Sequence, residues 1–436
     1  MDIRSMSDAT KLQIERAATL EDAIYLLNPQ KPLEGETLAY YVDRGSLARR
    51  DIQILLRAND LRRGEAVRIL FSGHTGCGKS TELNKLCEEL AGSFFIVKVS
   101  TSKIVQPTDL TYVDVVLIAA MELFRAATAQ EVIGKAPAVR LSEIWEDLAD
   151  FIRQRVFGHL PYRTPAESLD VTAKVSALIF EFETKYKSEA SSRDTIRSQM
   201  EGRLSEIIER INTLAVMVRQ STQRPVLFVF DDTDKPDPER GRALFFDHPT
   251  TLTGFQASAI YTFNIALWYS REFKTFRDYF SGRFLLPNIK LFHRDEAPDE
   301  HGCTLLQTVI DRRLQPDLIT PDALTQMIVA SGGLVRSLIG LGQFAAVNAL
   351  GRGAQRIEAQ DVARAIVELR NDFIASLREE EYTMLAALRR TKQLAADDEV
   401  QDLLQTVALL QYENGEVWCD VHPVVVELLR ERGLLA

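Results

Sequence analysis

Short runs of apolar and β-branched residues alternate with longer amphipathic stretches along most of the chain. Five of these runs have the length and composition of buried strands. They lie at residues 66–72, 94–100, 225–232, 259–268 and 283–292. Between the first two, Leu83, Leu86 and Leu90 recur at helical spacing. The order strand, loop, helix, strand predicts an α/β domain with a parallel sheet.

The remaining stretches follow a helical period. Residues 108–220 are almost continuously helical in pattern, and 193–220 keeps one apolar stripe typical of a long amphipathic helix. After about residue 299 the pattern is helical again, with two helices around Gly332 and Gly333 and a short helix at 356–370. Residues 1–35 predict one or two amphipathic helices. Residues 371–436 predict helices, a β-hairpin turning at Asn414–Gly415, and a closing helix.

Composition narrows the class of protein. With 436 residues the chain is long enough for about three domains. Its net charge of −10 argues against coating nucleic acid by bulk charge. Four scattered cysteines without a CxxC pair predict neither a disulfide framework nor a zinc site. The charged N-terminus lacks a signal-peptide core, and no apolar stretch reaches the roughly 18 residues of a membrane span. We therefore expect a soluble cytoplasmic protein that uses no membrane.

A glycine-rich turn after the first strand matches the pattern G-x-x-x-x-G-K-[ST]. Glycines let the backbone adopt positive φ and bring its N–H groups to phosphate oxygens, and the following helix adds the positive end of its dipole. Lys79 can then reach the β- and γ-phosphates, and Ser80 can offer a hydroxyl to Mg²⁺. We expect ATP or ADP to bind here. The nucleotide-binding residues are Gly73, His74, Thr75, Gly76, Cys77, Gly78, Lys79, Ser80 and Thr81.

A second acidic motif stands about 150 residues later, where the apolar run 225–232 ends in Asp231 and Asp232. In a phosphate-binding-loop fold, the first such aspartate orders the Mg²⁺ water shell, and the next carboxylate polarises the attacking water. We assign Asp231 to the metal and Asp232 to the general base. Asp234 is a second candidate for the base.

With these two motifs the chain resembles the AAA+/STAND group of P-loop ATPases. The group usually has Asp-Glu in the second motif, whereas this chain has Asp-Asp, which is frequent in the STAND branch of nucleotide-controlled switches. The resemblance implies a five-stranded parallel sheet with a helical lid and a C-terminal winged helix. The implied domains are an N-terminal arm (1–35), an ATPase core (36–298) with a helical insert at about 101–220, a lid (299–370) and a winged-helix-like module (371–436).

The same resemblance implies three further catalytic residues. Asn264, with Thr262 as the alternative, matches the polar sensor near the γ-phosphate. Arg336 matches the sensor arginine of the lid, a task that suits a planar, always charged guanidinium. Arg283 matches the arginine finger that enters a neighbouring subunit's ATP site and so implies a homo-oligomer. Arg271 and Arg277 are nearby alternatives to it.

The net charge of two segments indicates which kind of partner each could bind. Residues 271–294 hold six basic residues against two acidic ones, which suits an ATP-bound neighbour or a nucleic-acid backbone. Residues 371–436 hold thirteen acidic residues against six basic ones, which makes a poor DNA clamp and favours a protein-contacting or autoinhibitory module. The leading hypothesis is thus a nucleotide-controlled switch for an effector or adaptor protein. The alternatives are an initiator- or transposition-regulator-like DNA-handling ATPase and a scaffold that binds nucleotide without hydrolysing it.

Overall fold

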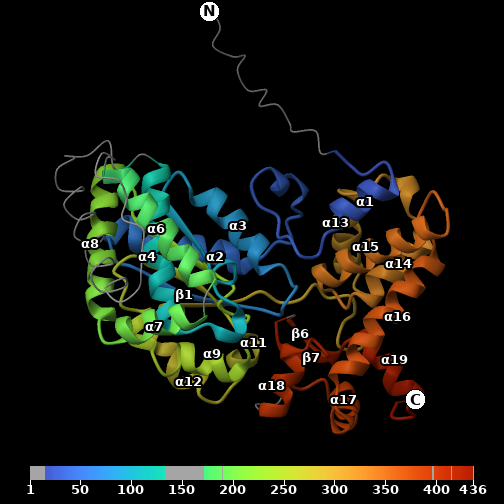
Figure 1. The fold of residues 1–436 in the computed structure, drawn as a ribbon. Helices are drawn as coiled ribbons and strands as arrows, with labels where there is room; N and C mark the ends of the chain where they lie inside the picture. The colour runs from blue at the N-terminus through green and yellow to red at the C-terminus, as the bar shows by residue number, and fades with distance from the viewer. Residues whose placement is uncertain are drawn as a thin grey trace, which may run out of the picture. The chain divides into compact units, whose positions relative to one another are not determined.

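The structure is a computed structural model, and it describes residues 15–130, 132, 171–188, 190–394, 397–413 and 415–435. Its contacts divide the chain into two compact units. One comprises residues 1–46, 73–85 and 286–436, and the other comprises residues 47–72 and 86–285. We call them the lid unit and the sheet unit (Figure 1).

The sheet unit is built on five parallel strands in the order β2-β3-β4-β1-β5. The strands are β1 (Arg68–Ser72), β2 (Phe95–Ser100), β3 (Val226–Asp231), β4 (Ser258–Phe263) and β5 (Gly282–Leu285). β4 is buried at every residue, as expected for a central strand covered on both faces. This sheet confirms the predicted α/β fold class.

Two strands are shorter than the sequence predicts. The apolar run 259–268 ends as a strand at Phe263, because Asn264 caps a short helix, α11 (Ile265–Trp268). The run 283–292 ends as a strand at Leu285, two residues before Pro287, which has no N–H to donate to a ladder. A buried apolar run alone does not reveal either change of element.

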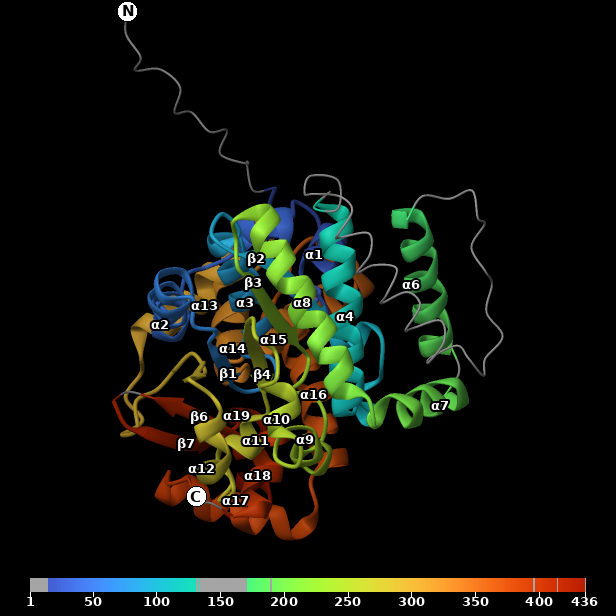
Figure 2. The same ribbon diagram turned by 90° about the vertical axis from the view of Figure 1, so that its left-hand side faces the viewer.

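Helices pack on this sheet. Figure 2 shows α4 (Tyr112–Ala129) and α8 (Leu204–Thr222) side by side, and both contact β2 or β3. The predicted long helix 193–220 is two helices, because α7 (Ala190–Glu201) ends before α8 begins. The other helices of this unit are α2 (Leu47–Leu56), α6 (Val171–Ser188), α9 (Pro238–Phe245), α10 (Pro249–Leu252) and α12 (Phe273–Phe276). Much of the predicted insert, residues 131 and 133–170, lies outside the described residues.

The lid unit is mainly helical. It contains α1 (Leu20–Leu26), a 3-10 turn at Gly35–Tyr40, α13 (Glu300–Asp311), α14 (Pro321–Ala330), α15 (Val335–Gly351) and α16 (Ala359–Ser376). The helices α14 and α15 flank Gly332 and Gly333 as predicted, and α16 runs six residues beyond the short helix expected at 356–370. Residues 1–14 of the predicted arm lie outside the described residues.

The C-terminal segment of the lid unit has the predicted order of helices, hairpin and closing helix. It consists of α17 (Glu379–Thr391), α18 (Asp398–Gln405), the antiparallel pair β6 (Leu409–Glu413) and β7 (Val417–Val421), and α19 (Pro423–Glu431). Asn414 of the predicted turn lies outside the described residues. The described helices include none that is long and apolar enough to cross a membrane.

Candidate phosphate-binding site

The glycine-rich turn at residues 73–78 follows the last residue of β1 and leads directly into helix α3 (Lys79–Leu90). Gly76 and Gly78 have φ of 87° and 106°, a region that L side chains avoid. A Cβ placed on Gly76 would lie 2.9 Å from the Cβ of Arg336, whereas one on Gly78 would meet nothing within 4 Å. Open space at Gly78 beside the N-terminus of α3 fits a cradle for phosphate.

Lys79 lies inside this turn. Its side chain is buried, and its Nζ donates to the carbonyl oxygens of Gly73 at 2.6 Å and His74 at 2.9 Å. These bonds hold a positive charge at the first residue of α3, within the curve of the loop. Thr81, two residues on, accepts a hydrogen bond from the Leu33 N–H through its Oγ1 at 3.2 Å. Its hydroxyl is thereby engaged with the N-terminal segment.

The N-terminal segment supplies contacts that the sequence does not reveal. The Arg44 guanidinium donates from Nη1 to the Cys77 carbonyl oxygen at 2.9 Å and from Nη2 to the Pro287 carbonyl oxygen. The Tyr41 hydroxyl donates to Glu82 of α3 at 3.0 Å. Cys77 lies 33 positions after Arg44, Glu82 lies 41 positions after Tyr41 and Pro287 lies 243 positions after Arg44, so no local motif marks these contacts.

His74 directs its side chain away from the loop and into the C-terminal segment. The ring is fully buried, its Nδ1 lies 3.2 Å from the Leu404 carbonyl oxygen, and its Nε2 accepts the Gln411 N–H at 2.8 Å. Burial, and then the nearby charge of Lys79, lower the pKa of His74 to about 3. The imidazole is therefore neutral at physiological pH, and its side chain contacts the hairpin.

Three residues, Asn264, Arg283 and Arg336, are implied by the resemblance alone. Arg336 belongs to the lid unit and contacts the glycine-rich loop there. It is the second residue of α15, and its backbone N–H donates to the Gly76 carbonyl oxygen at 3.0 Å. Its side chain is exposed. The turn at Gly332 and Gly333 thus delivers the N-terminus of α15 to the glycine-rich loop.

In the sheet unit, Asp231 is the last residue of β3, and Asp232 follows in an unusual backbone conformation with φ of 71°. Asp232 accepts hydrogen bonds from the Ser100 hydroxyl at 2.8 Å and from the Ser102 hydroxyl, and it pairs with Lys235 at 2.7 Å. Burial alone would raise the pKa of Asp232, but the bonds from Lys235 and the two serines outweigh it and lower the pKa.

The neighbouring strand β4 ends in the predicted sensor residues. Asn264 is buried, and its side chain accepts from the Ala266 N–H at 2.8 Å and donates to the Pro236 carbonyl oxygen at 3.0 Å. Thr262, the alternative, lies with its Oγ1 3.1 Å from the Thr233 hydroxyl. Both side chains thus brace the segment that follows β3, and their sensor role stays a prediction.

Arg283 lies on β5, an edge strand of the sheet. Its side chain is 38% exposed and pairs with Asp278 at 3.7 Å. Arg271 and Arg277, the alternatives for the arginine finger, are also exposed. Exposure leaves all three accessible to another molecule.

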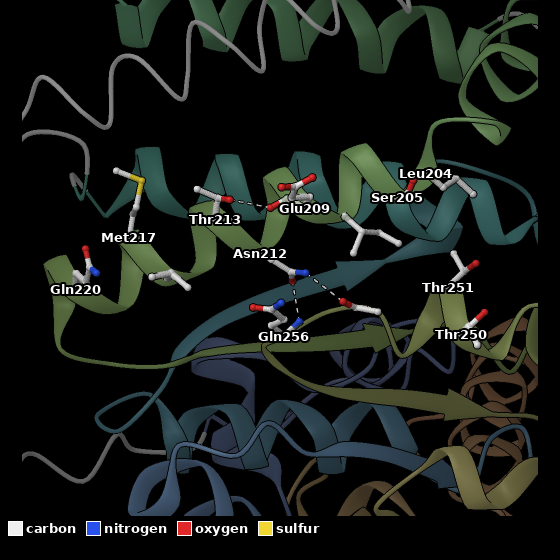
Figure 3. Close-up of a pocket in the computed structure, with 13 residues that line it drawn as sticks. Leu204, Ser205, Glu209, Asn212, Thr213, Met217, Gln220, Thr250, Thr251 and Gln256 are labelled. Atoms are coloured by element: carbon white, nitrogen blue, oxygen red, sulfur yellow. Dashed lines mark hydrogen bonds between the residues drawn. The ribbon is translucent and has the colours of Figure 1, made fainter.

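A cavity of the sheet unit lies on residues other than these motifs. It has a volume of about 940 Å³ and is lined along α8 and the α10–β4 segment (Figure 3). Asn212 closes its floor by donating to the Gly254 carbonyl oxygen at 3.1 Å and accepting the Gln256 N–H at 2.7 Å. No charged group other than Glu209 is among its lining residues.

Two buried histidines predict acid sensitivity. Burial lowers the pKa of His422 to about 3, as it does with help from Lys79 for His74. Below about pH 6.5 these two histidines are protonated in the unfolded chain but stay neutral in the folded chain. The free energy of unfolding should therefore fall as the pH drops towards 3. Each histidine should lower the free energy of unfolding by about 1.4 kcal/mol for every pH unit in this range.

Urea unfolding at pH 7, 6 and 5 measures this slope. The variant His422→Gln should lose one histidine's share, whereas His301→Gln, which changes an exposed histidine, should keep the wild-type slope. Equal slopes for the wild type and His422→Gln would contradict the assignment.

The parallel order of the five strands and the glycine-rich loop between β1 and α3 decide the fold. The core has an α/β fold with a P-loop between β1 and α3. No family model and no curated protein matches the sequence.

Several solved structures are similar over most of their length. Cdc6p from Pyrobaculum aerophilum is 13% identical with a TM-score of 0.42, and the alignment covers 94% of this chain and 98% of that one. The ORC1 protein of Aeropyrum pernix in complex with DNA is 14% identical at 0.41, with 94% and 97% covered. The RuvB Holliday junction branch migration motor of Thermotoga maritima is 13% identical at 0.37, with 92% and 99% covered. At these scores the likenesses transfer no function to this chain.

Proposed function

We propose that this protein binds ATP at the glycine-rich loop, hydrolyses it slowly, and uses the bound nucleotide to switch its affinity for a partner protein. One observation carries the proposal. The loop joins a buried strand to the N-terminus of α3, has positive φ at Gly76 and Gly78, and holds the ammonium of Lys79 within its curve. Backbone N–H groups, a helix dipole and a fixed cation together favour a polyphosphate.

The chain's own residues would divide the chemistry. The loop amides and Lys79 would hold the phosphates, and Ser80 and Asp231 are the residues that would hold Mg²⁺. The metal would supply neutralisation of phosphate charge. β1 and β3 are parallel with β4 between them, so Asp231, the last residue of β3, and Ser72, which directly precedes the loop, lie at the same edge of the sheet. Asp232, or Asp234 in its place, would orient and deprotonate the attacking water.

The switch would act through the lid unit. Arg336 meets the loop through its backbone while its side chain remains exposed. A guanidinium at this place can contact the γ-phosphate of ATP and finds no such partner in ADP. Differential contacts of this kind are what lets a ligand shift a conformational equilibrium.

Arg336→Ala should therefore reduce the preference for ATP over ADP by about 10-fold, the loss expected for one charge-assisted hydrogen bond. The backbone bond to Gly76 survives the substitution, so the fold should be unchanged. Isothermal titration with ATP and with ADP measures the ratio. Arg364→Ala, on the exposed side of α16, is the matched control. An unchanged ratio in Arg336→Ala would remove Arg336 from the switch.

Assembly through the ATP site is part of the proposal. Arg283, exposed on the edge strand β5, would reach the nucleotide of a second copy of the chain. Size-exclusion chromatography with light scattering, in ATP, in ADP and without nucleotide, tests this directly. We expect a larger mass with ATP. The same mass in all three conditions, despite bound nucleotide, would contradict nucleotide-controlled assembly.

DNA handling is the second candidate, because four basic side chains are exposed around β5 on a chain of net negative charge. They are Arg271, Lys274, Arg277 and Arg283. ATP turnover with and without duplex DNA separates the hypotheses. Stimulation by DNA would favour this candidate, slow and DNA-independent turnover favours the switch, and tight ATP binding without turnover favours a scaffold.

A further inference from the structure

The buried His74 side chain makes a two-ended contact with the C-terminal segment, and its protonation state follows from the donors. Nε2 faces the N–H of Gln411 at 2.8 Å, so it must be the acceptor. The ring is neutral, so Nδ1 carries the proton and donates to the Leu404 carbonyl oxygen at 3.2 Å. A residue of the phosphate-binding motif thereby bonds the end of α18 and strand β6 at once.

The register of the hairpin explains why Gln411 needs this partner. Gln411 lies opposite Cys419 of β7, and the Cys419 N–H donates away from the hairpin, to the Lys392 carbonyl oxygen. The two residues therefore form a pair that exchanges no hydrogen bonds, and the Gln411 N–H points away from β7. Gln411 is fully buried, so its N–H cannot turn to water. The imidazole of His74 takes the place that a third strand would fill.

Further contacts join the same hairpin to the turn that carries Arg336. The Tyr412 hydroxyl donates to the Gly332 carbonyl oxygen at 2.8 Å. A Cβ on Gly332 would lie 2.7 Å from Cδ1 of Leu410, so β6 packs directly on this turn. The turn leads into α15, whose Arg336 N–H bonds the loop at Gly76. Glycine-rich loop, turn and hairpin thus form a closed ring of contacts inside the lid unit.

We propose that His74 is a positioning residue that couples the phosphate loop to the C-terminal hairpin, so that nucleotide on the loop and docking of the hairpin alter each other's free energy. The inference rests on the proposed function, since it needs a nucleotide at the loop. Any change in the path of residues 73–78 moves the His74 backbone and with it the acceptor of the Gln411 N–H. By linkage, a hairpin held in place must change nucleotide affinity by the same factor.

Hydrogen exchange of the full-length chain, followed by mass spectrometry, measures the protection of the Gln411 N–H that bonds His74. Exchange of the peptide containing residues 409–413 is measured without nucleotide and with saturating Mg·ATP, while equilibrium dialysis measures ATP binding on the same samples. We expect wild-type exchange in this peptide to change at least 5-fold when ATP binds, the lower end of ordinary coupling between sites.

Three variants make the test specific. His74→Ala should speed exchange of residues 409–413 at least 5-fold without nucleotide and abolish its response to ATP. His74→Gln, whose amide can offer one acceptor and one donor, should restore part of both. Lys31→Ala, which changes an exposed lysine of the lid unit outside the phosphate loop, should leave hairpin exchange as in the wild type. Circular dichroism confirms that each variant is folded.

The outcomes distinguish the two proposals. If ATP binds but leaves exchange of residues 409–413 unchanged in the wild type, the coupling is overturned and the nucleotide site stands. If His74→Ala or, should that variant not fold, His74→Gln responds to ATP as the wild type does, His74 is not the link. If the wild type does not bind ATP, the proposed function fails and the coupling falls with it.

Discussion

Replacing Lys79 with alanine is expected to weaken ATP binding by about 100-fold or more, because the loop loses a side-chain cation that its own carbonyl oxygens hold in place. Hydrogen bonds to charged groups contribute about 1.5–3 kcal/mol each, and Lys79 can make more than one to a polyphosphate. The ammonium also bonds the carbonyl oxygens of Gly73 and His74, so the loop loses part of its own scaffold. Equilibrium dialysis with labelled ATP measures the affinity.

Lys31→Ala provides the control, since it removes an exposed lysine of the same unit. It should bind ATP as the wild type does. Thermal unfolding of both variants shows whether either substitution disturbs the fold. Wild-type affinity in a folded Lys79→Ala protein would refute the assignment of the phosphate loop.

Asp232→Asn should leave ATP binding intact and lower turnover by about 10²–10⁴-fold, the usual range for a lost general base. The structure adds a physical constraint, because the Asp232 carboxylate already accepts from Ser100 and Ser102 and pairs with Lys235. These partners favour the ionised carboxylate, the form that a base requires, while the lowered pKa makes it a weaker base. Slow hydrolysis is the expected consequence.

Steady-state phosphate release measures this effect beside two further variants. Asp234→Asn tests the alternative base, and Asp247→Asn changes an exposed aspartate of the same unit and should turn over ATP as the wild type does. If Asp232→Asn keeps normal turnover while Asp234→Asn loses it, the base is Asp234. If both keep it, neither aspartate activates the water.

The sequence predicts the sheet because short, continuously apolar runs are typical of strands that are buried on both faces, and each of the five runs overlaps an observed strand. It predicts the glycine-rich loop because the residues that need positive φ lie next to one another in the chain. Strand ends are less well predicted. Asn264 continues an apolar run in the sequence, yet its side-chain oxygen accepts the Ala266 N–H and so caps the start of a helix.

Contacts between distant residues are what the sequence leaves open. His74 meets Gln411 337 positions later, and Arg44 meets Pro287 243 positions later. No period or spacing links such pairs, because they depend on how separate elements pack. The motif predicts that residue 74 belongs to the phosphate loop, but only the folded chain shows that its ring completes the edge of a hairpin.

The two outer strands of the sheet have a consequence for how the protein behaves in concentrated solution. β2 has the exposed Lys98 at its centre, and β5 is only four residues long with the charged Arg283 in it. A strand that added to β2 would bury the charge of Lys98, and β5 is too short to pair stably with a strand of another molecule. Both features discourage the addition of a foreign strand to the sheet. Replacing Lys98 and Arg283 with valine would leave both edge strands without a charge. We then expect the protein to aggregate by pairing of these edges between molecules.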